Sequence, residues 1–342
     1  MNDNFNYEPP IIMSDAEKKS HKKIFSKLGF AFLTYMIISQ GLSILLEYAL
    51  YALNPSLLQN SELLLGIASA IQYVVALPIL VYFLRDIPKH TPAVNKIEPK
   101  TYFKYVTVAM FVMYFGSYIS TILMTYMEAY LGTSPENVVN TVLNNTDILF
   151  SALVVGIIGP IAEEFMFRKL FIDRLTPYGE AVAIFFPSLM FGLFHGNLYQ
   201  FFYAFFLGVM FSYIYIKSGK IIYSIALHIF VNLFCGVLPS ALYQMLDYEE
   251  LVELTLSGTL TEEYINANML PISLLGAYEI VMLVLVGIGL FKFVRNYRNI
   301  QINKGTVKFP KGTASEVIFL NAGTIILIAA CVLLMAYNTF AV

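Results

Sequence analysis

The chain has 342 residues, of which 58% are hydrophobic and 13% are charged, and its mean hydropathy is +0.68. Soluble proteins carry about a quarter charged residues, so this composition excludes an ordinary soluble globular protein and a disordered chain. The net charge of −2 provides no basic surface for phosphates, so nucleic acid is not an expected partner. The 24 tyrosines and 28 phenylalanines are interpreted as lipid-facing and interfacial side chains.

The hydrophobic residues are concentrated in nine long apolar stretches. A transmembrane helix needs about 20 such residues, and a backbone in lipid has to satisfy its own hydrogen bonds. The stretches lack the alternation of a barrel strand, so we predict an all-α polytopic membrane protein with about nine transmembrane helices. The fifth and sixth stretches meet at Gly196 and Asn197, which predicts a tight hairpin. The nine stretches cover residues 28–52, 62–84, 103–130, 147–172, 180–197, 199–217, 220–239, 270–293 and 315–339.

The basic residues support this number of spans. If the N-terminus is cytoplasmic, all 21 Lys and Arg residues fall in segments on the cytoplasmic side. The segments assigned to the other side, 53–61, 131–146 and 240–269, hold none and carry acidic residues instead. Cytoplasmic loops are enriched in Lys and Arg. The pattern therefore predicts an integral plasma-membrane protein, as in a bacterium, with a cytoplasmic N-terminus and an extracytoplasmic C-terminus.

Two adjacent carboxylates, Glu163 and Glu164, lie within the fourth apolar stretch. Ionisable groups inside a bilayer are costly and usually functional. Glu164 and Arg168 are i,i+4 neighbours on a helix and can pair, whereas Glu163 points about 100° away and is available for chemistry. Pro160 has no N–H, so we expect it to free the carbonyl of Gly156 and to kink the helix one turn before the acids.

Two of the four histidines also lie within apolar stretches. His195 is in the fifth stretch, and His228 is in the seventh, where Asn232 follows it on the same helix face. Glu163 lies 16 residues before Gly179, in the turn between spans four and five, and His195 lies 16 residues after it. Antiparallel helices that rise about 1.5 Å per residue bring these two side chains to a similar depth. By the same rise, His228 is expected about 13 Å from the end of its span, which is less deep.

A carboxylate and two imidazoles in a water-filled pocket can hydrolyse a peptide bond in two ways. Without metal, Glu163 takes a proton from a water that His195 helps to hold, and His228 and Asn232 donate hydrogen bonds to the oxyanion. With metal, Glu163, His195 and His228 bind Zn²⁺ and leave one position for water. The HExxH motif of the usual zinc-protease helix does not occur in the sequence. Both schemes stay open at this point, and zinc is the one cofactor that the sequence indicates.

Three short motifs in consecutive apolar stretches together resemble a known family. The motifs are Glu163-Glu164-x-x-x-Arg168, Phe191-x-x-x-His195 and His228-x-x-x-Asn232. They are similar to the three motifs of the CAAX-protease and bacteriocin-processing (CPBP) family of intramembrane endopeptidases, which includes the CAAX prenyl protease 2-like enzymes. The resemblance covers about residues 147–238, and the flanking segments add nothing specific.

The resemblance implies a function and a role for each motif residue. It implies a glutamate or metallo-endopeptidase that acts in the bilayer on a membrane-associated peptide or lipidated protein. Glu163 is implied as the catalytic glutamate, His195 as its water- or metal-binding partner, and His228 with Asn232 as the remaining catalytic residues. The supporting residues that it implies are Glu164, Arg168 and Phe191.

Four regions follow from this assignment. The first has a cytoplasmic tail and three transmembrane helices, the second is a catalytic core of four helices, the third is an acidic extracytoplasmic loop, and the fourth has two transmembrane helices. In the same order, they cover residues 1–130, 147–238, 240–269 and 270–342.

Other functions fit parts of the pattern. A non-catalytic membrane immunity or regulatory protein of the same fold keeps the motifs for stability alone. A proton-coupled transporter also holds Glu, His and Arg within its spans, although the chain has no internal repeat. In a cysteine peptidase, Cys235 would act with His228 and Asn232 on the same face, but nothing here lowers the pKa of the thiol. Glu279, deep in the eighth stretch beside Tyr278, either lines the same cavity or pairs with a Tyr hydroxyl.

Overall fold

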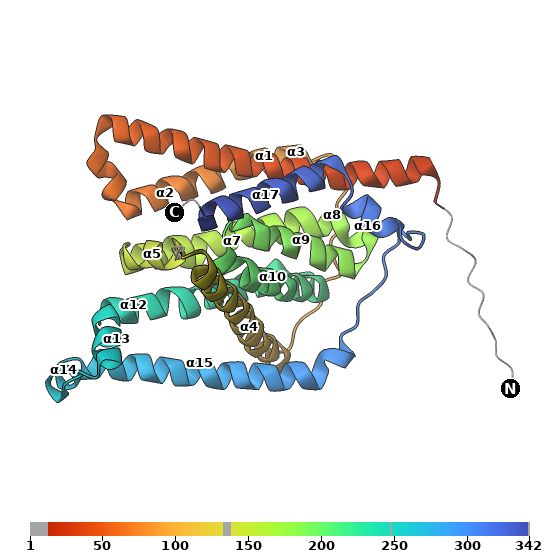
Figure 1. Ribbon diagram of the computed structural model, residues 1–342. Coiled ribbons are helices and arrows are strands. Elements are labelled where there is room, and N and C mark those ends of the chain that lie inside the picture. The colour runs from red at the N-terminus through yellow and green to blue at the C-terminus, as the bar shows by residue number, and fades with distance from the viewer. Residues whose placement is uncertain (1–12, 133–137, 247, 341–342) are drawn as a thin grey trace.

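The computed structural model describes residues 13–132, 138–246 and 248–340. Within these ranges every regular element is a helix and no strand occurs (Figure 1), which confirms the all-α prediction. Parts of two segments predicted to face outside, residues 133–137 and 247, lie outside the described residues. The α-helices are α1 (Asp15–Leu53), α2 (Ser61–Ala70), α3 (Leu77–Leu84), α4 (Pro99–Leu131), α5 (Val138–Asn144), α6 (Ile148–Leu153), α7 (Gly159–Glu164), α8 (Asp173–Leu175), α9 (Glu180–Phe194), α10 (Leu198–Ser218), α11 (Ile221–Asn232), α12 (Leu238–Gln244), α13 (Tyr248–Ser257), α14 (Glu262–Ala267), α15 (Met269–Asn296), α16 (Thr313–Ile318) and α17 (Ala322–Phe340).

Eight helical stretches of the described residues are long and apolar enough to cross a membrane. A further helix, α9, is apolar but has only 15 residues. It forms the expected hairpin with α10, and Gly196 in the connection has a φ of 65°, which glycine adopts without strain. The eight stretches are Asp15–Leu53, Ser61–Leu84, Pro99–Tyr130, Ile148–Tyr178, Leu198–Ser218, Ile221–Gln244, Met269–Asn299 and Ala322–Phe340.

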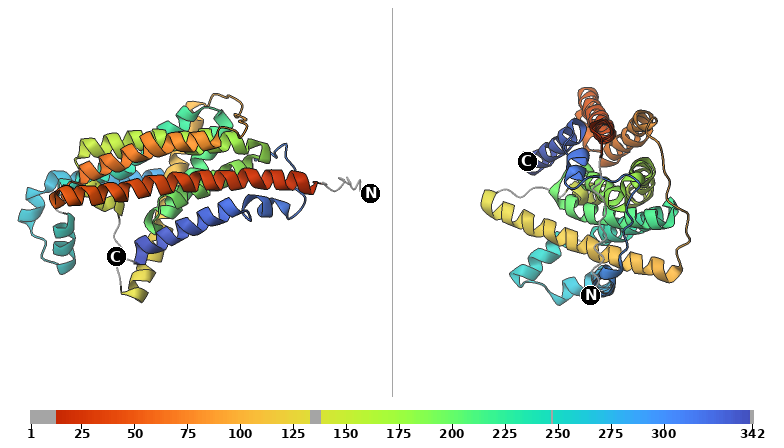
Figure 2. Two further views of the ribbon diagram at one scale, coloured as in Figure 1. Left: turned by 90° about the horizontal axis from the view of Figure 1, so that it is seen from above. Right: turned by 90° about the vertical axis from the view of Figure 1, so that its right-hand side faces the viewer.

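The helices from α6 to α12 form the middle of the bundle. Within it, α10 packs against α9 and α11, and it also packs against α4, which crosses the bundle obliquely (Figures 1 and 2). On one side of this middle layer α1 packs against α17, and on the opposite side α15 packs against α4. The four-helix segment predicted to carry the site is therefore enclosed by the flanking helices.

Two of the outer helix crossings depend on glycine. A Cβ on Gly323 of α17 would lie 1.9 Å from the carbonyl oxygen of Ser26 on α1. A Cβ on Gly289 of α15 would lie 2.0 Å from the carbonyl oxygen of Thr107 on α4. Helices in lipid gain little from hydrophobic burial against each other, so small residues that let two backbones approach are a main source of their packing.

Ion pairs connect segments that were predicted to be cytoplasmic. The Nζ of Lys18 on α1 lies 2.6 Å from Oε2 of Glu316 on α16. The Nζ of Lys217 at the end of α10 lies 2.5 Å from Oε2 of Glu180 at the start of α9. The Lys18–Glu316 pair is near the surface, where such a pair contributes at most about 1 kcal/mol, and the Lys217–Glu180 pair is half-buried; both join the ends of helices.

The acidic segment predicted between residues 240 and 269 is helical over much of its length. The apolar span of α11 and α12 continues to Gln244. Two short helices, α13 and α14, follow before α15 begins at Met269. The hydroxyl of Thr261 caps α14 by accepting a hydrogen bond from the N–H of Tyr264 at 3.2 Å.

Two glycines on one helix provide a matched test of the packing. Gly289→Ala should lower the thermal unfolding midpoint of the purified protein, because the new Cβ would overlap the backbone of Thr107; overpacking of this kind costs about 1–3 kcal/mol. Gly287, two residues earlier on α15, has nothing within 4 Å of its Cβ position. Gly287→Ala should therefore leave the midpoint unchanged or raise it slightly, and equal losses in both variants would contradict the assigned crossing.

Candidate active site

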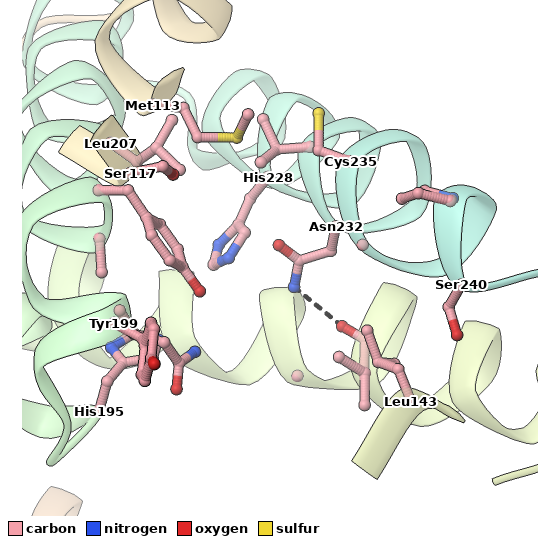
Figure 3. Close-up of a pocket in the computed structure, with 18 of the residues that line it drawn as sticks. Met113, Ser117, Leu143, His195, Tyr199, Leu207, His228, Asn232, Cys235 and Ser240 are labelled. Carbon is pink, nitrogen blue, oxygen red and sulfur yellow. Dashed lines mark hydrogen bonds between the residues drawn. The ribbon is translucent and has the colours of Figure 1, made fainter. Parts of the chain in front are cut away.

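One cavity brings the predicted catalytic residues together. Its volume is about 630 Å³, within the range of about 300–1,000 Å³ that is usual for ligand sites. Glu163 of α7, His195 at the end of α9, and His228 and Asn232 of α11 all line it. In Figure 3, His195 lies on the side of the cavity opposite to His228 and Asn232. His228 was expected to lie less deep in the membrane than Glu163 and His195, but it lines the same cavity as these two residues and Asn232.

The helices that line the cavity change register just before prolines. In each case a π-helical segment precedes an α-helix whose second residue is proline. Proline lacks the N–H that an α-helix needs, and π-helical turns absorb such breaks and are frequent at functional sites. The π-helical segments are η2 (Ile71–Ala76) before Pro78, η3 (Val154–Ile158) before Pro160, and η6 (Leu233–Val237) before Pro239.

Asn232 bonds to a carbonyl beside the break at Pro160. Because the N–H of Gly159 bonds five residues back, the missing N–H of Pro160 leaves the carbonyl of Val155 without its donor. The side-chain Nδ2 of Asn232 donates to that oxygen at 2.9 Å. A regular α-helix would have freed Gly156, as we expected, and the π-helical register moves the position by one residue. Asn232 keeps its second N–H for the cavity.

The imidazole of His228 lies between two carboxylates. Its Nδ1 is 3.0 Å from Oε1 of Glu164, and its Nε2 is 3.7 Å from Oε2 of Glu163. A carboxylate paired with a guanidinium is ionised and only accepts hydrogen bonds, so the Nδ1 of His228 carries the proton of the bond to Glu164. Glu164 therefore orients the ring so that Nε2 faces Glu163. Glu164 and His228 are 64 residues apart, and the sequence did not predict their contact.

Arg168 is completely buried and is paired with Glu164. Its Nε lies 3.0 Å from Oε2 of Glu164, and neither side chain has any exposed surface, so the pairing expected from the i,i+4 spacing is present. The guanidinium carbon lies 5.3 Å from the ring centre of Phe191 and 5.5 Å from that of Phe211. Aromatic faces attract a guanidinium, more strongly when water is excluded. Phe191 thus supports Arg168, in addition to lining the cavity.

The orientation of His195 is set by the turn between α9 and α10. Its Nδ1 lies 2.7 Å from the carbonyl oxygen of Phe191. A carbonyl only accepts, so Nδ1 carries the proton and the neutral ring keeps a lone pair on Nε2. Asn197 fixes the turn, because its Oδ1 accepts from the N–H of Gln200 and its Nδ2 donates to the carbonyl of His195, both at 2.9 Å.

The residues suggested for zinc do not form a metal site. In the part of the chain that the structure describes, no three side chains of His, Cys, Asp or Glu are arranged to hold a metal ion. Glu163, His195 and His228 share the cavity, and hydrogen bonds from Nδ1 leave Nε2 of each imidazole available, but the three side chains are not close enough together to form one ligand set. The donor set therefore does not fit zinc, and we derive no step through a metal.

Tyrosines make up much of the remaining cavity wall. The sequence interpretation placed tyrosines at lipid-facing and interfacial positions and did not predict that six of them line the cavity. An aromatic residue within a span can face lipid or a neighbouring helix, so its orientation is known only from the packing. The one feature of the sequence that indicated a tyrosine in the cavity was Glu279 beside Tyr278, and Glu279 also lines the cavity. The hydroxyl of Tyr73 and Oε1 of Glu163 lie 3.3 and 3.9 Å from the Cβ position of Gly159. The six are Tyr73, Tyr114, Tyr199, Tyr203, Tyr243 and Tyr278.

Comparison with known proteins agrees with the motifs. Residues 145–234 match the model of the family "Rce1-like: Type II CAAX prenyl endopeptidase Rce1-like". Over 178 residues the chain is 24% identical to the "Putative membrane peptidase YdiL" of Bacillus subtilis (strain 168), which covers 51% of this chain and 71% of YdiL. Over 121 residues it is 26% identical to the "UPF0177 protein YxdF" of Lactococcus lactis subsp. lactis (strain IL1403), which covers 35% of this chain and 67% of YxdF. No solved structure matches significantly.

The matched segment contains all three motifs, from Glu163 to Asn232. It also corresponds to α6–α11, the middle of the bundle, which α1–α4, α15 and α17 enclose. The resemblance predicted from the motifs is therefore confirmed: this chain is an all-α polytopic membrane protein whose residues 145–234 are related to the Rce1-like CAAX prenyl endopeptidases, a family of membrane proteases.

Proposed function

We propose that the chain is an intramembrane endopeptidase that hydrolyses a peptide bond of a membrane-associated peptide or lipidated protein. The observation that carries the proposal is the single cavity lined by Glu163, His195, His228 and Asn232. The family match and the name of the relative YdiL support a peptidase over a transporter. The thiol of Cys235 donates to Sδ of Met110 at 3.6 Å, which gives a cysteine-peptidase reaction no support.

In the proposed reaction, Glu163 is the general base and then the general acid. A water donates one hydrogen bond to the Nε2 lone pair of His195 and gives its other proton to Glu163. The hydroxide oxygen forms a bond to the peptide carbonyl carbon, and the carbonyl oxygen becomes an oxyanion. The C–N bond then breaks, and Glu163 returns its proton to the leaving nitrogen, so the enzyme is regenerated.

Asn232 and His228 are proposed to stabilise the oxyanion. One N–H of Asn232 is held by Val155, which leaves the other to donate to the oxyanion. The Nε2 atom of His228 faces Glu163 at 3.7 Å, and in the proposed reaction it donates as part of an imidazolium whose Nδ1–H stays bonded to Glu164. Once Glu163 has taken the water proton it is neutral, so the Nε2–H can turn to the new negative charge. Glu164 acts as a positioning residue because it bonds to the ring of His228, and Arg168 acts through its ion pair with Glu164.

The first test is Glu163→Gln. Purified protein in nanodiscs is incubated with peptides from a digested bacterial membrane proteome, and new cleavage sites are read by mass spectrometry. Wild type should produce a reproducible set of cleavages, and Glu163→Gln should abolish them because an amide cannot accept the water proton; loss of a general base costs about 10²–10⁴-fold. The variant should keep the wild-type thermal midpoint.

The matched control is Glu47→Gln, which changes an exposed carboxylate on α1 and should retain the cleavages. Full activity of Glu163→Gln would sink the glutamate mechanism. The metal-free reaction would be contradicted if a chelator removed both the activity and a stoichiometric zinc ion, and if added zinc restored the activity. A folded wild type that cleaves nothing would favour the non-catalytic immunity or regulatory protein.

A second test concerns the buried pair. Arg168→Met should lower the thermal midpoint and the yield of folded protein strongly, because Glu164 would be left as an unpaired buried charge; breaking such a pair costs about 3–5 kcal/mol. The double variant Glu164→Gln with Arg168→Met removes both charges and should recover part of the loss. Arg295→Ala, at an exposed position of α15, is the control. If Arg168→Met folds like wild type and is inactive, Arg168 has a direct catalytic role instead.

We further propose that the chain is a plasma-membrane protein whose N-terminus is cytoplasmic and whose C-terminus is extracytoplasmic. The support is the placement of all 21 Lys and Arg residues on one side by the positive-inside rule. In a bacterium, green fluorescent protein fused after Val342 should stay dark and alkaline phosphatase fused there should be active. The opposite pair of results would mean that one expected span does not cross the membrane.

A further inference from the structure

The cavity extends away from Glu163 to a second carboxylate that the proposed reaction does not use. Glu279 of α15 lines this end, with its neighbour Tyr278 and with Tyr114 of α4. Glu279 is close enough to both phenols to act on them electrostatically. The helices that carry these three residues lie outside the segment 145–234 that the family model matches, so this end is built by the flanking part of the chain.

Within the part of the chain that the structure describes, Glu279 has no cationic partner, unlike the other two carboxylates near the cavity. Glu164 contacts Arg168, and Glu163 faces His228. Among the described residues, no cationic side chain forms an ion pair with Glu279. A carboxylate within a membrane span is costly, and it is found where it pairs or lines a polar cavity as part of a site. Its position therefore points to a cation that enters from outside the chain.

The charge of the cavity favours the same kind of ligand. Glu163 and Glu279 both line the cavity, and the described lining residues include no lysine or arginine. Beside Glu279, the rings of Tyr114 and Tyr278 add a second attraction, because an ammonium or guanidinium is stabilised over an aromatic face and more so where water is excluded. An acidic side chain would be repelled by the carboxylate of Glu279 at this end.

This end of the cavity lies a short distance from the proposed reaction centre. Cys235 follows Asn232 by three residues and lines the cavity beside it (Figure 3), and Tyr114 and Tyr278 line the same cavity. Three helical residues rise about 4.5 Å, and an extended peptide advances about 3.3 Å per residue. A group bound at Glu279 in the same cavity therefore belongs to a substrate residue near the scissile bond.

We propose that Glu279, Tyr114 and Tyr278 form a subsite for a lysine or arginine side chain of the substrate. The proposal rests on the endopeptidase function proposed above and narrows its substrate class to peptides with a basic residue near the cleavage point. The carboxylate of Glu279 binds the ammonium or guanidinium group, and the two rings pack against its aliphatic stem and its charge. The subsite selects the substrate and takes no part in proton transfer.

The test uses internally quenched ten-residue peptides in which one lysine is moved through every position. Each peptide has a partner with norleucine, which keeps the aliphatic stem and removes the charge. Wild type in nanodiscs should cleave the best lysine peptide with a kcat/KM at least about tenfold above its norleucine partner. Glu279→Gln should reduce this ratio to about one, and Glu279→Lys should favour a glutamate at the same position. Glu47→Gln should keep the wild-type ratio.

A binding measurement separates failure of the subsite from failure of the enzymatic function. Fluorescently labelled peptides of the same pairs are titrated onto Glu163→Gln protein with and without Glu279→Gln. Lysine-dependent binding that is lost in the double variant, without cleavage by wild type, would support the subsite and overturn the endopeptidase. Cleavage by wild type with equal rates for lysine and norleucine at every position would overturn the subsite alone. Equal binding of both peptides to Glu163→Gln would also overturn it.

Discussion

A guanidinium without exposed surface lies in the middle of this bundle, 3.0 Å from Glu164 and against the rings of Phe191 and Phe211. Such a charge is tolerated only where partners surround it. Arg168 is paired through Nε with Glu164 on its own helix and lies against phenylalanines of α9 and α10, while its Nη atoms have no hydrogen-bond partner among the described residues. Glu164 in turn holds His228 on α11. One buried charge thus specifies how four helices meet, and the same contacts leave Glu163 facing the cavity.

The prolines contribute the second constraint on the site. The break before Pro160 exposes the carbonyl of Val155, and Asn232 from another helix bonds to it. This contact couples the position of α11 to the irregular stretch that precedes Glu163. A helix without a proline at this point would satisfy its own carbonyls and would leave no free acceptor for the side chain of Asn232. The polar residues of the cavity are therefore placed by broken backbone bonds as much as by packing.

The sequence predicted those structural features that depend on the spacing of residues along one helix or one turn. Hydrophobic run length gave the all-α membrane architecture, the i,i+4 rule gave the pair of Glu164 and Arg168, and the turn at Gly196 gave the hairpin. Contacts between distant residues were beyond such rules, and the bond between Glu164 and His228 is the main example. The tyrosines of the cavity wall were also missed, because their spacing within a span does not distinguish a lipid-facing position from an inward one. Helix α9 was expected to be a full span, and its shortness follows from where the hairpin turns.

The length of α9 has a consequence for the surrounding lipid. Fifteen residues rise about 22 Å, whereas the hydrocarbon core is about 30 Å thick and the 21 residues of α10 on the other side of the turn rise about 31 Å, so only one arm of the hairpin is shorter than the core. At this tip Asn338 of α17 donates to the carbonyl of Gly196 at 2.8 Å, which places polar groups at a level where acyl chains would otherwise lie. Hydrophobic mismatch of this kind is relieved by local thinning of the leaflet. The short arm therefore favours a thinner leaflet beside α9, at the end of the hairpin where His195 lies.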